Sequence, residues 1–230
     1  MSSSDPGLRE RLARVDAAIA DAAREAGRDP SGLTRIVVTK FHPASLVREL
    51  AELGVRDVGE NRHQEAAAKA AELVDLALAW HFIGQLQSNK AKAVRRYARA
   101  VHSVDRDSLV SALALPLADA EPLDIFLELN LSDDPGRGGV DPAALEPLAE
   151  RVLLTPGLVL RGVMAVAPLG EDPRRAFERV RAASESLRLR APDAVAISAG
   201  MSGDFREAIL EGATHLRIGT AITGKRPTAG

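Results

Sequence analysis

Ile36-Val37-Val38-Thr39-Lys40 joins four β-favouring residues to a lysine, and Phe41-His42-Pro43 ends the run. A short apolar run that stops at a turn signal predicts a buried parallel strand. Lys40 should therefore lie where this strand ends. Desolvation lowers the pKa of a lysine and makes its amine a nucleophile toward carbonyl carbons, so Lys40 is a candidate for covalent chemistry. The alternative is a lysine at a strand end whose amine simply reaches water.

The rest of the chain alternates strand and helix patterns. Further strands are expected at 55–58, 80–83, 101–104, 123–129, 158–166, 194–198 and 215–218. Helices are expected at 43–53, from 62 to about 76, 88–98, from 105 toward 119, 142–154, 173–190 and 204–211. Strict alternation implies parallel strands with right-handed crossovers. Eight such units without a strong edge-strand signal predict an α/β fold, a (β/α)8 TIM-type barrel. A doubly wound open sheet is the alternative.

An extra helix comes before the first strand. Asp5-Pro6 begins it and Gly27 ends it. Its apolar residues repeat at helical spacing, at Leu8, Leu12, Val15, Ile19 and Ala22. Because almost no helix follows the last strand, we expect this N-terminal helix to fill the gap in the outer ring.

Composition limits the class of protein. Nothing in the 230 residues marks a domain break, and 46% hydrophobic content suits one core, so 1–230 is expected to form a single domain. A net charge of -2 argues against a nucleic-acid partner. The absence of cysteine excludes disulfides and thiol catalysis. The histidines lack ligand spacing, so no metal site is expected. No signal peptide or membrane span is visible, which predicts a cytoplasmic protein with no membrane partner.

Polar and glycine-rich residues follow nearly every expected strand. Because a parallel barrel carries its active site at the carboxyl ends of its strands, these residues should meet at one mouth. Phosphate sites in such barrels usually follow strands seven and eight, here Ser198 to Gly203 and Arg217 to Thr220. Their glycines and free N–H groups, with the hydroxyls of Ser202 and Thr220, would suit a phosphate. Asp204 would repel it, so we expect Asp204 to cap the following helix.

A nucleophilic lysine that faces a phosphate cradle suggests a phosphorylated aldehyde. Pyridoxal 5'-phosphate (PLP) fits, with an imine to Lys40, the phosphate at the far end and a polar partner for the ring nitrogen. A Schiff-base aldolase would need the same two features. Arg217 lies in an apolar strand and needs a partner, for which a structural carboxylate is one alternative.

Seven motifs, in order, resemble those of one known family. They are Val38-Thr39-Lys40, Gly59–Arg62, Trp80–Lys90, His102–Arg106, Gly162–Met164, Gly200–Asp204 and Leu216–Ile222. The resemblance covers nearly the whole chain, and the run from Trp80 to Lys90 is highly specific. On these motifs the chain is similar to the pyridoxal phosphate homeostasis proteins of the YggS/PROSC type. The resemblance implies the fold type III barrel of alanine racemase without its second domain, so that 1–230 is one PLP-binding domain.

The resemblance also implies a function and a site. The protein would carry PLP as a Schiff base on Lys40 and act in intracellular PLP homeostasis, without an established catalytic reaction. Apo-PLP enzymes would be its recipients, and it would be a monomer or a weak dimer. The residues implied to bind the cofactor are Ser202, Gly219 and Thr220 at the phosphate with Ser198 nearby, Arg217 at the ring nitrogen, and Asn61 and Met201 close by.

The sequence departs from the family at three positions. His42 and Arg137 stand where lysines are common in relatives, and Ala199 replaces a methionine. The first two put in doubt any transfer of PLP between lysines.

The alternative function is an enzyme, either a racemase-like PLP enzyme acting on amino acids or a Schiff-base aldolase. Alanine racemase uses a tyrosine from its second domain as one of two bases. This chain should have no such domain, and Tyr97, its only tyrosine, is expected on an outer helix. An aldolase would need an acid or base at the mouth, where Glu60 and Asp105 are the candidates.

Overall fold

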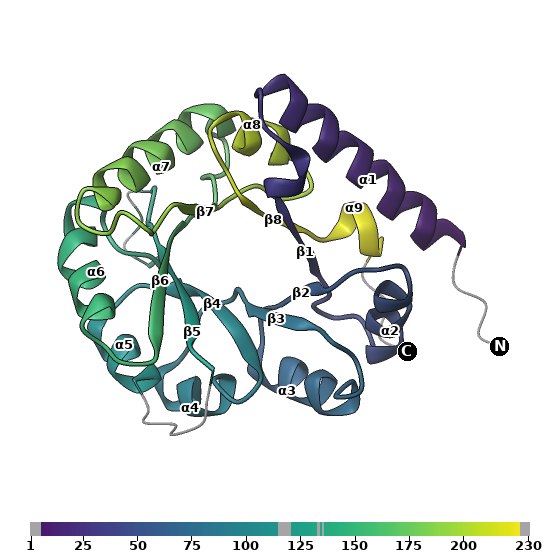
Figure 1. Ribbon diagram of the computed structural model, residues 1–230, viewed down its shortest axis with the longest axis horizontal. Coiled ribbons are helices and arrows are strands. Elements are labelled where there is room, and N and C mark those ends of the chain that lie inside the picture. Colours follow the sequence, from purple (N-terminus) through teal and green to yellow (C-terminus); the bar gives the residue numbers. More distant parts are fainter. Residues whose placement is uncertain (1–5, 115–120, 133, 135, 226–230) are drawn as a thin grey trace.

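The eight strands form a closed barrel in a computed structural model that describes residues 6–114, 121–132, 134 and 136–225 (Figure 1). The strands are β1 (Thr34–Val38), β2 (Asp57–Glu60), β3 (Ala79–Phe82), β4 (Ala98–Val104), β5 (Leu123–Glu128), β6 (Leu158–Met164), β7 (Ala196–Ser198) and β8 (His215–Ile218). Each pairs in parallel with the next, and β8 pairs with β1. The predicted (β/α)8 barrel is confirmed, and the open sheet is wrong.

Helices surround the barrel on the outside (Figure 1). They are α1 (Pro6–Glu25), α2 (Ala44–Glu52), α3 (His63–Glu72), α4 (Ala91–Val94), α5 (Asp107–Leu113), α6 (Leu145–Leu153), α7 (Pro173–Arg188), α8 (Phe205–Leu210) and α9 (Thr220–Thr223), with short 3-10 turns at η1 (Pro30–Gly32), η2 (Ser88–Lys90) and η3 (Pro142–Ala144). Helix α1 packs against α8 and α9. Arg28, just after α1, donates to the carbonyl oxygens of Ile209 and Ala213. The N-terminal helix therefore fills the gap in the outer ring, as expected.

Several element boundaries differ from the sequence prediction. β2 runs from 57 to 60 because its pairing with β3 begins at Asp57 opposite Ala79. The helix expected at 88–98 ends at Val94, because Ala98 already pairs with Trp80 in the sheet. Tyr97 consequently lies in the turn before β4 and not on a helix. The expected extension of α5 toward 119 and part of the 133–139 loop fall outside the described residues.

The sequence predicts Asp105 and Asp204 as caps of the helices that follow them, but neither side chain makes such a bond. Asp105 does not cap α5, because Arg106 is the residue at the cap position. The Asp105 carboxylate instead accepts from Arg106 Nη1 at 2.6 Å and from the backbone N–H of Gly139 at 3.3 Å. Asp204 occupies the cap position of α8, but its side chain bonds to no N–H of that helix and instead accepts from the backbone N–H of Met201 at 2.6 Å. Both carboxylates stabilise loops at the mouth.

The core has two parts of different character. Most buried apolar residues lie between the strands and the helices and form one continuous cluster. A separate small cluster consists of Ala100, Phe126, Met164 and Ala196. The ring of His102 stacks on that of Phe126, with centroids 4.2 Å apart. The barrel interior therefore holds apolar side chains beside the polar ring of His102.

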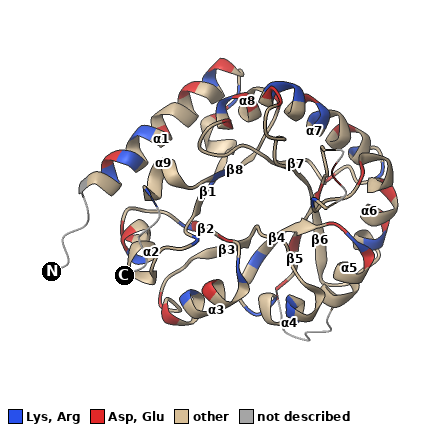
Figure 2. Cartoon of the chain, turned by 180° about the vertical axis from the view of Figure 1, so that it is seen from behind, with Lys and Arg blue, Asp and Glu red and all other residues tan. Residues whose placement is uncertain are grey.

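Charged residues of both signs are spread over the outer helices (Figure 2). Among the described helices, none combines the length and the apolar character that crossing a bilayer would require.

Candidate functional site

Lys40 lies in a turn just after β1, whose last residue is Val38. The backbone N–H of Thr39 donates to Gly59 at 3.0 Å, and that of His42 donates to Thr39 at 3.1 Å, which closes the turn. Lys40 is half-buried, and its Nζ is 5.9 Å from the centre of the Phe41 ring. Phe41 has a φ of 69°, in the left-handed region that bulky residues rarely adopt. Such strain persists where the surroundings enforce it, most often at functional sites.

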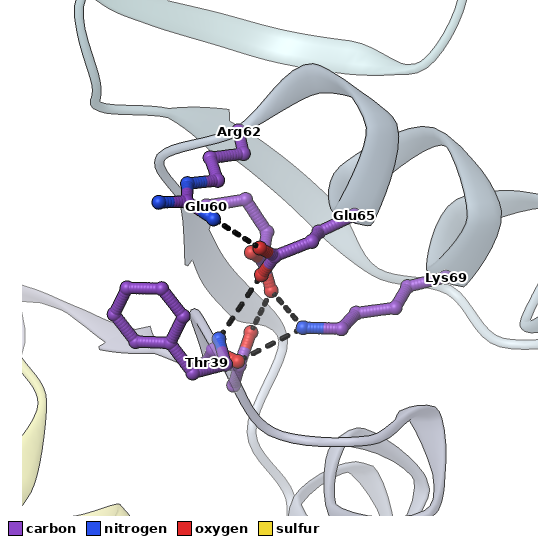
Figure 3. A network of polar contacts seen from close by, with 6 residues as sticks. Thr39, Glu60, Arg62, Glu65 and Lys69 are labelled. Atoms are coloured by element: carbon purple, nitrogen blue, oxygen red, sulfur yellow. Dashed lines mark hydrogen bonds and ion pairs between the residues drawn. The ribbon is translucent and has the colours of Figure 1, made fainter. Parts of the chain in front are cut away.

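A buried ion pair from β2 and α3 supports this turn (Figure 3). Lys69 Nζ donates to Glu60 Oε1 at 2.6 Å and to the carbonyl oxygen of Thr39 at 2.9 Å. The Thr39 hydroxyl donates to the same carboxylate oxygen at 2.6 Å. Burial raises the pKa of Glu60, while the hydrogen bonds from Lys69 and Thr39 act in the opposite direction.

The other side of the turn is held by Glu65, whose Oε2 accepts from the backbone N–H of Phe41 at 3.1 Å (Figure 3). The two neighbours of Lys40 are thus fixed by α3. No sequence pattern indicated this arrangement, since neither Lys69 nor Glu65 follows a strand.

The loops after β7 and β8 are in direct contact. Ser202 Oγ accepts from the backbone N–H of Ala221 at 3.2 Å, and the N–H of Arg217 donates to Gly200 at 2.9 Å. Gly200 has a φ of 91°, and a Cβ there would lie 2.8 Å from that of Ala208. Only glycine fits this close approach between the loop and α8.

These two loops present unused hydrogen-bond donors. Within the described chain, the backbone N–H groups of Ser202, Gly203, Gly219 and Thr220 donate to no protein group. A Cβ at Gly219 would lie 3.6 Å from Cβ of Val38, the last residue of β1. The donors and Lys40 therefore belong to the same part of the mouth, where free N–H groups suit an anion.

Arg217 lies below these loops and is 5% exposed. Its Nη1 donates to the carbonyl oxygen and to Oγ of Ser198, both at 2.7 Å, and its Nη2 donates to Ala165 at 2.8 Å. A structural carboxylate partner is therefore wrong: no described Asp or Glu bonds to it. Burial lowers the pKa of Arg217 to about 10, against the opposing charges of Glu128 and Asp204. Two of the five guanidinium N–H groups are left for a ligand.

Asn61 follows β2 at the mouth and has an unused acceptor. Its Oδ1 is buried and has no hydrogen-bond partner in the described part of the chain. Gly84 makes room for it, because a Cβ at that position would lie 2.3 Å from the Asn61 carbonyl oxygen. A buried acceptor without a protein partner is expected to bind a ligand or a water molecule. Met201 is 38% exposed beside the β7 loop.

The sequence did not single out Glu128, the last residue of β5. Its carboxylate accepts from Gln85 Nε2 at 2.8 Å, and burial together with Asp105 raises the pKa of Glu128 to about 7. Glu128 lies in an apolar run that was interpreted only as a strand. A single carboxylate in such a run is itself an indication of a functional residue, because carboxylates are rarely buried. Of the two carboxylates considered as acids or bases, Glu60 is engaged by Lys69 and Asp105 by Arg106.

Residues 15–227 match the family model of the alanine racemase N-terminal domain. A pyridoxal phosphate homeostasis protein of Pseudomonas aeruginosa is 44% identical over 223 residues, which cover 95% of this chain and 96% of that protein. The chain belongs to the pyridoxal phosphate homeostasis protein family. The resemblance found in the motifs is thereby confirmed.

Solved structures agree with this assignment. PipY of Synechococcus elongatus, solved with PLP bound, has a TM-score of 0.81 and 35% identity, and the match covers 94% of this chain and all of that one, 100%. Alanine racemase of Corynebacterium glutamicum has a TM-score of 0.67 at 17% identity, covering 96% of this chain and 62% of the racemase. The latter likeness shows the fold alone. Members of this family therefore share their barrel with catalytic proteins.

Proposed function

We propose that this chain binds PLP at the barrel mouth as a Schiff base on Lys40 and acts as a carrier in intracellular PLP homeostasis. The observation that carries the proposal is that the end of β1, next to Lys40, lies against the loop after β8, which in turn contacts the loop after β7, and both loops have unused N–H donors. PLP bound to PipY supports the same cofactor here. The whole of 1–230 would form one PLP-binding domain.

The residues at the mouth fit the parts of PLP. Ser202, Gly219 and Thr220 would hold the phosphate with N–H and hydroxyl groups. Arg217 would donate one of its unused N–H groups to the ring nitrogen. Asn61 and Met201 would lie beside the ring. When bound, PLP supplies an aldehyde that condenses with amines and a ring that can withdraw electrons.

Ser198 would act through Arg217. Its side chain is fully buried, and its hydroxyl bonds to His102 and Arg217. Any part that it plays in cofactor binding is therefore indirect.

Two features support a carrier and not an enzyme. An arginine beside the ring nitrogen only donates, so the nitrogen must accept and stay unprotonated, which weakens electron withdrawal. A second base of the racemase kind is also absent from the described mouth, since Tyr97 stacks on His63 of α3 outside the barrel, with ring centroids 5.9 Å apart. We propose apo-PLP enzymes as recipients, a cytoplasmic location, and a monomer or weak dimer.

One observation favours a second candidate, a weakly active PLP enzyme of the racemase or aldolase kind. Glu128 is at the mouth, and its pKa of about 7 is suited to proton transfer near neutral pH. In that case Glu128 would be the acid or base.

Spectra of the purified protein test the proposal. The wild type loaded with PLP should show the visible band of a lysine Schiff base, and Lys40→Ala should lack it after dialysis. Lys92→Ala is the matched control, because Lys92 is exposed on outer helix α4. Loaded protein should then activate an added apo-PLP enzyme without converting amino acids itself. Retention of the band in Lys40→Ala would refute the assignment, and amino-acid turnover would favour the enzyme.

A further inference from the structure

Two histidines from the sequence motifs have no role in the site described so far. His81 in β3 is 6% exposed and His102 in β4 is 0% exposed. Buried polar side chains that bind no ligand are costly unless each finds a partner. Both histidines find partners inside the barrel.

Their hydrogen bonds form a continuous relay through the barrel. His81 Nε2 is 3.0 Å from Asp57 Oδ1, and His81 Nδ1 is 2.9 Å from His102 Nε2. His102 Nδ1 is 2.9 Å from Ser198 Oγ, which accepts from Arg217 Nη1 at 2.7 Å. Because β4 and β7 are not neighbours in the sheet, the bond between His102 and Ser198 crosses the interior.

The two ends of the relay fix its direction. A guanidinium can only donate, and an ionised carboxylate can only accept. When both rings are neutral, Ser198 must accept from Arg217 and give its own hydrogen to His102 Nδ1. His102 then donates from Nε2 to His81 Nδ1, and His81 donates from Nε2 to Asp57. Ser198, His102 and His81 then each give one hydrogen and receive one, with both rings neutral.

The surroundings favour this neutral state. Burial, followed by the charges of His81, Arg217 and His215, holds the pKa of His102 well below its usual range. The stacked ring of Phe126 also limits how His102 can turn. If His81 held a second proton, His102 would have to change tautomer and the Ser198 hydroxyl would lose its acceptor.

The relay joins opposite ends of the barrel. Asp57 is the first residue of β2, its side chain is 33% exposed, and it lines a cavity at the floor with Arg35 and Arg56. Arg217 is close to the mouth, where the β8 chain continues into Gly219 and Thr220. Solvent thus reaches the relay at Asp57.

We propose that Asp57, His81, His102 and Ser198 are positioning residues that hold Arg217 as a donor toward the ring nitrogen of PLP, so that a change at the barrel floor alters cofactor binding at the mouth. The proposal rests on the proposed function for its effect on PLP. The hydrogen bonds of the relay are present in the protein without cofactor.

The first test is nitrogen-15 NMR of the histidine rings in PLP-free wild-type protein at neutral pH. We expect His81 and His102 both to carry their proton on Nε2. A proton on Nδ1 of His102, or an imidazolium at either residue, would overturn the relay. This readout needs neither a variant nor PLP, so it separates failure of the relay from failure of the proposed function.

The second test replaces Asp57 with asparagine, whose amide can either accept or donate and so removes the fixed direction. Asp57→Asn should weaken PLP binding by roughly 2–10-fold, the range for one hydrogen bond. It should also shift the nitrogen-15 signal of the ring in labelled PLP, which a loss of folding stability alone would not do.

Asp124→Asn is the matched control, because Asp124 also lies near the floor but pairs with Arg99 and Arg161 outside the relay. It should leave both the affinity and the ring signal unchanged. If Asp57→Asn and Asp124→Asn have the same PLP affinity and the same nitrogen-15 ring signal, the proposed link between the barrel floor and PLP binding is refuted. If Asp57→Asn does not fold, Ser198→Ala takes its place in the same comparison.

Discussion

Replacement of Lys69 by methionine should destabilise the protein far more than the loss of one surface lysine. Methionine has a similar length but no charge, so the Glu60 carboxyl, 1% exposed, would keep only the Thr39 hydroxyl as a hydrogen-bond partner. The change also removes the donor to the Thr39 carbonyl oxygen, one residue before Lys40.

The expected magnitude follows from the burial of the pair. Removal of one partner from a buried ion pair costs about 3–5 kcal/mol, because the other charge stays desolvated. For a chain of this size that corresponds to a drop in Tm of roughly 6–20 °C. Lys92→Met, at an exposed position on α4, should change the free energy of unfolding by less than about 0.5 kcal/mol.

The loss should also depend on pH. Burial already raises the pKa of Glu60, and removal of Lys69 takes away the largest opposing contribution, so the folded-state pKa rises further. A group whose pKa is higher in the folded state gives its full stability below its unfolded pKa and loses it as the pH rises through the folded pKa. Lys69→Met should thus lie closest to wild type near pH 5 and fall further behind toward pH 8.

Thermal and urea unfolding of four proteins measures these effects: wild type, Glu60→Gln, Lys69→Met and the double variant. The double variant should be about 1–3 kcal/mol more stable than Lys69→Met alone, because it contains no unpaired buried charge. A single-variant loss below about 1 kcal/mol, or a double variant no better than Lys69→Met, would refute the reasoning.

Three further outcomes are expected. Ser202→Ala combined with Thr220→Val should weaken PLP retention at least roughly tenfold by equilibrium dialysis, since charge-assisted hydrogen bonds are worth about 1.5–3 kcal/mol each; unchanged retention would place the phosphate elsewhere. L- or D-alanine should show negligible α-proton exchange in heavy water by NMR, and exchange at about 1 per second or faster would indicate an enzyme. The pKa of Glu128 is raised to about 7, so its ionisation destabilises the folded state as the pH rises from about 4.5 to 7. Glu128→Gln should therefore have a higher Tm than wild type at pH 8 but not at pH 5. An equal gain in Tm at both pH values would show that Glu128 is not the cause.

The barrel could be predicted because each strand and helix carries its own local pattern. β8 was predicted at its observed bounds, 215–218, since its apolar residues Leu216 and Ile218 alternate with polar ones between the turns at Gly212 and Gly219. β2 was placed two residues too early, because its ends depend on pairing with β3 and not on its own composition.

The site was predictable only where residues follow strands directly. Lys40, Ser202 and Thr220 do so, and the fold brings their loops together. The partners of Glu60 and His102 could not be predicted, because Lys69 lies on a helix and Ser198 on the opposite side of the barrel. Contacts of this kind depend on how helices pack and how the barrel closes. The hydrophobic periodicity of a single segment carries no information about either.

The pairing of β8 with β1 has a consequence for synthesis. Val37 pairs with Ile218, so β1 must wait until β8 has been synthesised before the sheet can close. Until then both are exposed edges, which invite association with other chains. Lys40 and the loop at Gly219 and Thr220 follow these two strands, so the complete site exists only after all eight strands have left the ribosome. On the proposed function, tight retention of PLP would therefore report that a molecule has finished folding.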